Sequence, residues 1–214
     1  MAELVNSVAS FTYDNLIGGG DPELHTKNIT LVSGAGSLKR GTVLGKITKG
    51  AISSAAKSGG NTGNGDFGTL SLGAKAKVGV YTLKANTETT FTVINPDGIC
   101  LADAMIGIAY AGEIDFTIIA GEIAFVADDS FTVTVAAGSG KYKTVNSANT
   151  DGSQVMDCVL SRDTDATSTD VDTIAYYSGL FNIEALTFGG TDTYETHQDA
   201  LRSLDIYLTG EKRV

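Results

Sequence analysis

The most constraining feature of this sequence is a run of short apolar stretches that recur at regular intervals between residues 69 and 136. The stretches are rich in β-branched and aromatic residues, and turn-forming segments such as Asn95-Pro96-Asp97-Gly98 separate them. Spacing of this kind is typical of a β-sandwich or a β-barrel. We therefore predict strands at residues 69–72, 79–85, 89–94, 104–109, 114–119 and 130–136.

Two glycine-rich segments bracket this run. Residues 58–68 read SGGNTGNGDFG, and residues 137–140 read AGSG. Glycine, asparagine and serine in such density favour linkers. A self-sufficient β unit between two linkers suggests a domain inserted at an exposed turn of another domain. We expect a β-sandwich-like insert at residues 58–141 and a discontinuous body at residues 25–57 and 142–214.

The flanking segments predict a body that is mainly β with one short helix. Asp192 and Thr193 can cap a helix that continues to about Ser203, with Glu195 near its positive end. Glycines interrupt the second of the expected strands, which suggests a bend or bulge. The strands are expected at residues 27–32, 38–47, 155–160, 171–177, 184–188 and 206–208.

The first 24 residues predict an extended N-terminal arm. The segment 8–13 alternates apolar and polar residues in the way a strand does. Three consecutive glycines, Gly18, Gly19 and Gly20, follow it. Because glycine leaves the backbone unusually free, we expect these residues to uncouple the arm from the body.

The charge of the chain argues against two classes of partner. Its formal net charge is −10 and its pI is about 4.5, so phosphate backbones and anionic membranes are repelled. No stretch approaches the roughly 18 apolar residues of a membrane span. The first residues have no basic segment and no long apolar core, so we expect synthesis in the cytoplasm without a signal peptide.

Few side chains in the sequence could support catalysis or bind a metal ion. We expect His25 and His197 on the surface, and Cys100 and Cys158 as buried, reduced thiols. The acidic segment 163–172 is interpreted as a solvated loop, with calcium binding as the alternative, although it lacks the central glycine and terminal glutamate of an EF-hand. No nucleophile-elbow motif is present. We expect no catalytic site, no cofactor and no metal; an enzyme with a dispersed site stays open as an alternative.

Several segments, taken in order, resemble the head decoration protein family of tailed phages, the group that includes the lambda capsid-stabilising protein. No single motif is diagnostic, and the order of the segments along the chain carries the resemblance. The middle of the chain, residues 69–142, is similar to a β unit found in longer members. The segments are residues 36–45 (GSLKRGTVLG), 151–153 (DGS), 159–160, 171–179 and 201–208, with 79–83, 95–98 and 129–133 in the middle.

The resemblance implies a compact mixed α/β fold with a small β-barrel-like body. It also implies homotrimers that bind the major capsid protein at threefold and quasi-threefold points on the outer surface of the expanded head, and thereby stabilise it. The N-terminal arm would become ordered on the shell, where a strand can add to an exposed sheet edge. Three arms on one trimer would raise the effective concentration. The apolar arm residues expected to contact the capsid are Leu4, Val5, Val8, Phe11, Tyr13, Leu16 and Ile17.

Two other functions remain open at this point. One is a carbohydrate- or cell-surface-binding β module, with the insert as the binding part. Aromatic residues make up only 7% of the chain and tryptophan is absent, which weakens the case for a sugar site. The other is a different structural part of the virion, such as a tail-tube or baseplate subunit.

Overall fold

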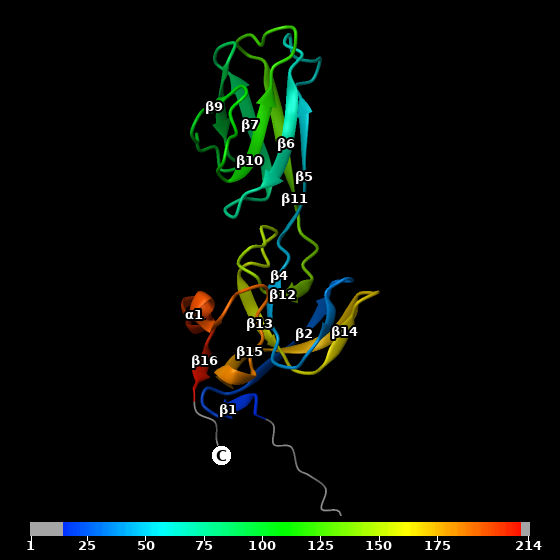
Figure 1. Ribbon diagram of the computed structural model, residues 1–214, viewed down its shortest axis with the longest axis vertical. Coiled ribbons are helices and arrows are strands. Elements are labelled where there is room, and N and C mark those ends of the chain that lie inside the picture. The colour runs from blue at the N-terminus through cyan, green and yellow to red at the C-terminus, as the bar shows by residue number, and fades with distance from the viewer. Residues whose placement is uncertain (1–14, 211–214) are drawn as a thin grey trace, which may run out of the picture.

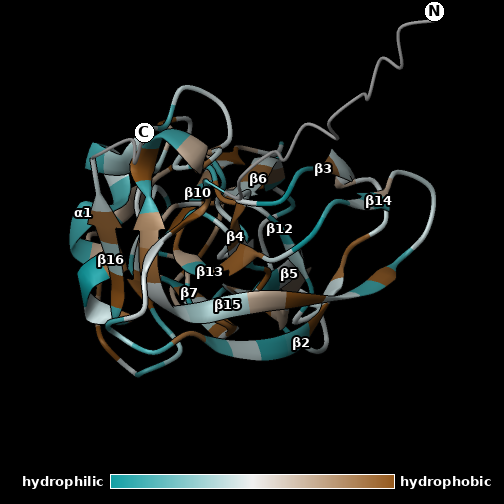
Figure 2. Cartoon of the chain, turned by 90° about the horizontal axis from the view of Figure 1, so that it is seen from below, coloured by the Kyte–Doolittle hydropathy of each residue, from teal (hydrophilic) through white to brown (hydrophobic). Residues whose placement is uncertain are grey.

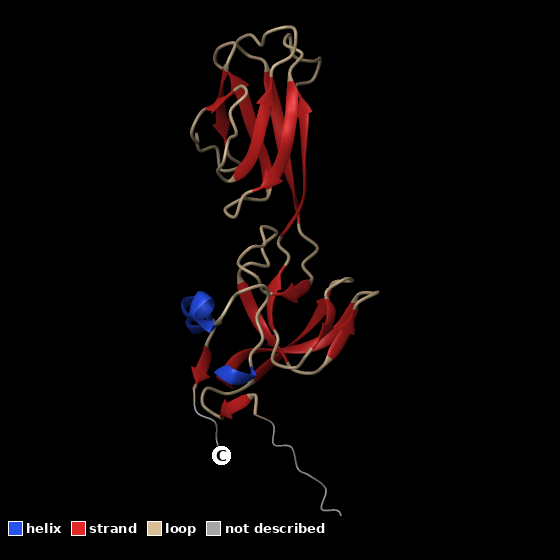
Figure 3. Cartoon of the chain, in the orientation of Figure 1, coloured by secondary structure: helices blue, strands red, loops and turns tan. Residues whose placement is uncertain are grey.

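A computed structural model of the chain describes residues 15–210 and places them in two β-rich units stacked along the long axis (Figures 1 and 3). The lower unit, here called the body, contains segments from both halves of the chain, and the upper unit, the insert, comes from the middle. The predicted fold class is confirmed, because strands dominate both units. In the described residues α1 (Tyr194–Ser203) is the one α-helix, and η1 (Ile183–Ala185) is a short 3-10 turn.

A closed five-stranded barrel forms the centre of the body. The strands pair in the order β15-β13-β4-β12-β2, and β2 pairs again with β15 to close the ring. Alternating residues point inward, so Leu31, Leu44, Cys158, Leu160 and Ala175 are fully buried inside. The barrel strands are β2 (His25–Leu31), β4 (Val43–Lys46), β12 (Tyr142–Thr144), β13 (Met156–Leu160) and β15 (Val171–Asn182).

A second, smaller sheet lies at the lower end of the body. The pairing register of β15 with β2 shifts between Tyr176 and Ser178. Beyond this point β15 pairs with β1 (Ile17–Gly19) antiparallel and with β16 (Ile206–Thr209) parallel. We call this three-stranded arrangement the base sheet (Figure 1). A separate ribbon of β3 (Gly36–Leu38) and β14 (Thr164–Ala166) extends from the barrel.

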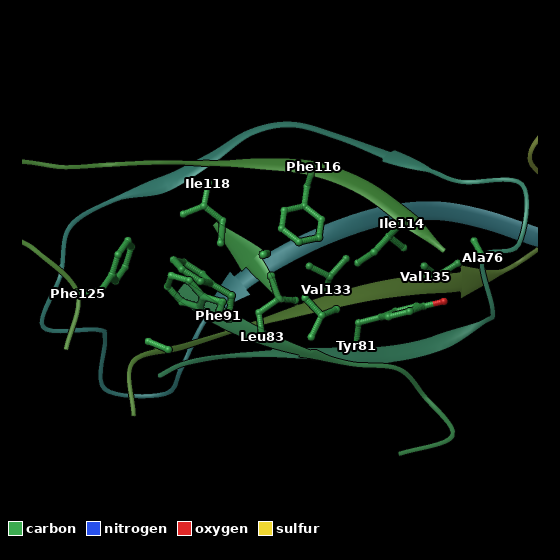
Figure 4. Close-up of a cluster of buried hydrophobic side chains, with 14 residues drawn as sticks. Ala76, Tyr81, Leu83, Phe91, Ile114, Phe116, Ile118, Phe125, Val133 and Val135 are labelled. Carbon is green, nitrogen blue, oxygen red and sulfur yellow. The ribbon is translucent and has the colours of Figure 1, made fainter. Parts of the chain in front are cut away.

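The insert is a sandwich of a five-stranded and a two-stranded sheet. Its core lies between them, where Phe116 and Ile118 of the small sheet face Leu83 and Val133 of the large one (Figure 4). The large sheet has the order β5 (Lys49–Ala56), β11 (Ser130–Ala137), β7 (Gly79–Ala85), β8 (Thr90–Ile94) and β9 (Ala104–Met105), and the small one pairs β6 (Asp66–Leu72) with β10 (Ile114–Ile119).

Most of the predicted elements are confirmed. Strands β7 and β10 have the predicted bounds, and the helix begins directly after Thr193 and ends at Ser203. At the start of the helix the Thr196 hydroxyl accepts a hydrogen bond from the Thr193 N–H (3.3 Å). Alternation and capping chemistry therefore located these elements correctly.

Three strand predictions need correction. The strand at 104–109 ends at Met105, because the Ile108 N–H donates to the Met105 carbonyl and closes a turn (3.2 Å). The strand at 184–188 is wrong, since the Asn182 side chain accepts from the Glu184 N–H and starts η1 instead. The expected strand at 38–47 is divided between β3 and β4, with the bend at the glycine-containing segment between them.

The strand pairing indicates where the insert begins. Strand β5, which the sequence places in the body, pairs along its length with β11, and its Ile52 packs against the core of the insert. The glycine-rich segment after it forms the turn from β5 to β6. We therefore propose Lys49 and Ala137 as the ends of the insert.

The two chain connections between body and insert lie side by side and form a neck. The Gly138 N–H donates to the Thr48 carbonyl (2.9 Å), and the N–H groups of Thr48 and Lys49 both donate to the Asp151 carbonyl (2.9 and 2.8 Å). The Gln154 amide of the body and the Lys49 ammonium donate to the Ala74 carbonyl of the insert (3.1 and 3.2 Å). These bonds join the two units where the chain crosses between them.

One buried carboxylate orders the glycine-rich turn of the insert. The side chain of Asp129 is fully buried and accepts hydrogen bonds from the N–H groups of Thr62, Gly63 and Val126 (2.8–3.1 Å) and from the Lys57 ammonium (3.0 Å). Burial by itself raises the pKa of Asp129, but these donors outweigh it and hold the pKa well below its usual range.

We expect Asp129→Ala to lower the free energy of unfolding by about 3–5 kcal/mol, because it leaves buried donors and a cation without an acceptor. The neighbouring Asp128→Asn is the matched control, because asparagine also tolerates the positive φ of 74° at this position. The Asp128 carboxylate is exposed and pairs with Lys84 at the surface (2.7 Å), so loss of its charge has little effect on stability. Urea denaturation of both variants measures the difference; equal effects would contradict the assignment.

The same carboxylate predicts a pH dependence. Because the pKa of Asp129 is depressed in the folded state, its stabilisation is present above the unfolded pKa of about 3.9 and is lost as the pH falls below that value. The difference in unfolding free energy between the wild type and Asp129→Ala should therefore shrink between about pH 5 and pH 2. A difference that stays constant over this range would exclude a charged Asp129 as the cause.

Candidate functional site

The lower end of the body is the candidate functional site. It contains the base sheet, the start of β2 and the point where the described chain begins at Asn15, and it lies at the opposite end of the molecule from the insert (Figures 1 and 2). We call this end the base face. The expected arm therefore joins the body here.

Two of the seven arm residues lie within the described chain, and the structure places one of them in the core. Leu16 is 2% exposed and packs with Val43, Phe181 and Leu201 in the cluster above the base sheet. Its backbone carbonyl accepts from the Asn182 N–H (2.8 Å). Ile17 begins β1 opposite Phe181 and is half-buried. The other five residues, Leu4, Val5, Val8, Phe11 and Tyr13, lie outside the described residues.

The expected uncoupling at the three glycines is wrong for the first two of them. Gly18 and Gly19 belong to β1, which is hydrogen-bonded to β15. A Cβ at Gly18 would lie 2.3 Å from Thr209 Cγ2, and one at Gly19 would lie 2.9 Å from Leu180 Cδ2. Glycine is used here because the strand lies very close to its neighbours, and not as a hinge.

Beside the arm's root the base face has an aromatic hollow. The rings of His25 and Tyr177 stack at 5.7 Å, and Tyr177 is 41% exposed. Two shallow pockets meet at Tyr177, Leu204 and Asp205. Tyr177 and Leu204 contribute apolar surface to the hollow, and His25, Asp157 and Asp205 contribute polar groups.

An ion pair forms one wall of this hollow. The Lys27 ammonium contacts the Asp157 carboxylate. Burial lowers the pKa of Lys27, but the hydrogen bond and charge of Asp157 more than compensate and leave it above its ordinary value. The wall of the hollow therefore carries an ion pair between β2 and β13. Sequence reasoning missed it, because Lys27 and Asp157 come from opposite halves of the chain.

A cluster of serine, aspartate and histidine lies at the start of α1, with the histidine buried and the serine exposed. His197 is only 5% exposed, so its expected surface position is wrong; His25 is exposed as expected. The His197 Nε2 contacts the Asp192 carboxylate (2.8 Å), which also accepts from the Ser147 hydroxyl (2.5 Å). The aspartate stands between serine and histidine, whereas a hydrolytic triad needs histidine in the middle. The cluster instead ties the start of α1 to the segment after β12.

The two cysteines differ in exposure. Cys158 is fully buried inside the barrel, as expected, and burial raises the pKa of its thiol to about 12. Cys100 is exposed, so its expected burial is wrong. It follows the turn at Asn95-Pro96-Asp97-Gly98 and joins the sheet only through a bridge to Ile94. Its apolar neighbours in sequence gave no sign of this.

The carboxylates of the acidic segment are directed to separate partners. Asp163 accepts a hydrogen bond from the Arg40 N–H (2.8 Å) and pairs with Lys39. Asp165 accepts from the nearby Thr167. Asp170 accepts from the Ser33 N–H (2.8 Å), and Asp172 accepts from the Thr30 hydroxyl (2.7 Å). Within residues 15–210 no group of three or more His, Cys, Asp and Glu residues is arranged to hold a metal ion. Nor does any helix in that range have the length and apolar character to cross a membrane.

The resemblance segments meet at the neck. Gly45 of β4 lies against the backbone of Ser153, and a Cβ there would be 2.2 Å from the Ser153 carbonyl oxygen. The Asp151 side chain accepts from the Ser153 hydroxyl (2.6 Å) and pairs with Lys143 (2.8 Å). Two stretches that are separate in sequence thus form one contact of the barrel.

The fold defines a class of protein, a small closed β-barrel that carries an inserted β-sandwich. The family model of bacteriophage lambda head decoration protein D matches residues 8–207 of the 214-residue chain. The chain therefore belongs to this head decoration protein family. The match includes the body, the neck and the insert, which agrees with the resemblance seen in the sequence.

Other comparisons add little. A search of curated proteins finds no match. Among solved structures, two crystal forms of FlgL from Xanthomonas campestris are similar at 18% and 20% identity, each with a TM-score of 0.34. These alignments cover 46% and 47% of this chain and 33% of FlgL, so this chain matches a third of the length of that protein.

The burial of Leu16 predicts that its side chain contributes to the stability of the body. Leu16→Ala should lower the free energy of unfolding by about 2–4 kcal/mol, because it leaves a cavity beside Phe181. The control is Tyr207→Ala on β16, since that side chain is 44% exposed; it should cost about 1 kcal/mol or less. Thermal melts of both variants provide the measurement. If Leu16→Ala is as stable as the control, the described packing is incorrect.

Proposed function

We propose that this chain is a structural decoration protein that binds the outer surface of the expanded head of a tailed phage as a homotrimer and stabilises it. The observation that carries the proposal is the family match over residues 8–207, which spans both units. The partners are the major capsid protein and further copies of the chain, and the location is the outside of the virion after synthesis in the host cytoplasm. We propose no enzymatic role.

The arrangement of the two units supports an orientation on the shell. The base face and the insert lie at opposite ends of the long axis (Figure 1). The arm joins the body at the base face, so binding through the arm directs the base face toward the capsid. The insert then projects away from the shell.

The segment before Asn15 supplies the contact in this proposal. Its apolar residues Leu4, Val5, Val8, Phe11 and Tyr13 can fill pockets on a capsid sheet edge while the backbone adds as a strand. Leu16 then anchors the root of the segment inside the body instead of touching the capsid. A contact this small is weak alone, and three of them on one trimer act together.

The outer face of β15 supports self-association. Ala175 points into the barrel and is fully buried, whereas Ile174 and Tyr177 point outward and are 36% and 41% exposed. Exposed apolar side chains of this size are common in contacts between subunits. A trimer that binds the expanded shell more tightly than the unexpanded shell stabilises the expanded form by mass action, because each binding event lowers the free energy of the expanded form more.

The experiment is co-sedimentation of the purified chain with expanded, undecorated capsids, with unexpanded procapsids as control. We expect saturable binding to expanded capsids. Deleting residues 2–14 should abolish it and leave the melting temperature unchanged. Deleting residues 2–20 is not a clean test, because it also removes Leu16 and β1 from the core and the base sheet.

Each result has a defined meaning. Normal binding by the folded 2–14 deletion would exclude the arm as the main contact. The aromatic hollow would then be the candidate for the capsid contact. No binding by the intact chain to either shell would refute decoration. A glycan array with the intact chain would then test the cell-surface alternative.

A further inference from the structure

Strand β5 is an open edge of the large sheet in the insert. Among the described residues it stands at the end of the strand order and pairs with β11 alone, and Figure 1 shows it along one side of the insert. Within residues 15–210 no backbone hydrogen bond joins Ala51–Ala56 to any other strand. The alternate N–H and C=O groups of the strand therefore face outward, as a template for another strand.

Most of this edge lacks the features that normally prevent pairing, and a register shift with β11 lies at its start, between the partners of Val135 and Ala137. From Gly50 to Ala56 the strand contains no charged residue and no proline, and its register with β11 is regular from Ile52 to Ala56. Ser53, Ser54, Ala55 and Ala56 are all exposed and small. The opposite edge, β9, is only two residues long. Proteins usually protect an open edge with charges, proline or bulges.

The surface beside the edge is also almost uncharged. The register places Ser53 next to Thr134 and Val80, and Ala55 next to Thr132 and Thr82, on the outer face of the sheet. In the described outer face of β5, β11 and β7 the one charged side chain is Lys84, at the far end, where it pairs with Asp128 (2.7 Å). In a chain with a net charge of −10, such a surface is unusual.

We propose that β5 pairs with β5 of a second copy of this chain, antiparallel and across a twofold axis. A twofold contact brings each residue of the strand against its counterpart, so a strand suits it only when its own side chains do not repel one another. The small, neutral side chains of β5 meet this condition, and like charges directly opposite would not. Pairing joins the two large sheets into one continuous sheet.

The pairing is weak in free solution and depends on crowding. One pair of short strands buries much less than the roughly 1,200 Å² of total surface found in stable interfaces. The three copies of a threefold trimer cannot all meet across twofold axes, so the contact joins copies of different trimers. If the decoration function proposed above is correct, inserts that project from neighbouring positions on a shell are held at high local concentration, and the contact links them laterally.

A cysteine scan tests the pairing without any capsid. Cys100→Ser first removes the exposed thiol, and single cysteines are then placed at each position from Ala51 to Ala55. At the twofold axis a residue faces itself at a Cα separation of about 4.5–5.5 Å, within disulfide reach, and a residue two positions away does not. We expect oxidation of the concentrated full-length protein to give a disulfide dimer at one position, at least about fivefold above positions two residues away.

A charge variant provides the second measurement. Ser53→Lys should reduce the concentration-dependent association seen in sedimentation velocity by at least about tenfold, because it places like charges on both strands of a contact whose side chains are otherwise neutral. Thr69→Lys is the matched control, since Thr69 is also exposed but lies on β6 of the small sheet. Both variants should keep the wild-type melting temperature, since neither side chain is buried.

The outcomes separate this proposal from the decoration function. Equal disulfide yields at all positions, or equal effects of the two lysine variants, would overturn β5 pairing whatever the result of capsid binding. Failure of capsid binding with a sharp disulfide maximum would leave the pairing intact and remove only its role on a shell. A maximum at one position that Ser53→Lys abolishes supports the proposal.

Discussion

One continuous strand holds the body together, because β15 belongs to two sheets at once. Its first half pairs with β2 and β13 and closes the barrel, and its second half carries β1 and β16 in the base sheet. The shift in register between Tyr176 and Ser178 permits the change of partners. A bulge that redirects a strand in this way is a designed feature of many sheets. The base face depends on it, since Leu16, Phe181 and Ile206 reach a common core only when all three strands are in place.

The sequence predicted what local patterns control. Alternation located β7 and β10 to the residue, and capping chemistry located α1. Prediction from the sequence failed where contacts between distant segments determine the structure. The burial of His197 is explained by Asp192 and by Phe188, whose ring stacks on it at 5.6 Å, and neither contact follows from a pattern in the neighbouring residues. Likewise, the glycine-rich segment after β5 looked like a linker, whereas the remote Asp129 makes it an ordered turn inside the insert.

The same distinction between local patterns and distant contacts applies to the candidate site. The apolar character of the arm was readable from the sequence, but its boundary was not, because nothing local distinguishes the buried Leu16 from the apolar residues that precede it in the sequence. The hollow around Tyr177 was not predictable, since its walls come from β2, β13, β15 and the end of α1. Family membership, by contrast, was detectable from the order of segments such as 36–45 and 151–153, which meet at a close backbone contact of the barrel.

The double connection at the neck has a mechanical consequence. Both chain crossings, at Thr48 and at Gly138, lie next to each other and continue directly into the paired strands β5 and β11. A sideways force on the far end of the insert is therefore divided between two backbones, and it bends a stiff two-stranded ribbon instead of stretching a single flexible tether. The hydrogen bonds of Gln154 and Lys49 to Ala74 add a brace on one side of this ribbon. The neck therefore resists sideways bending of the insert more than a single-chain linker would.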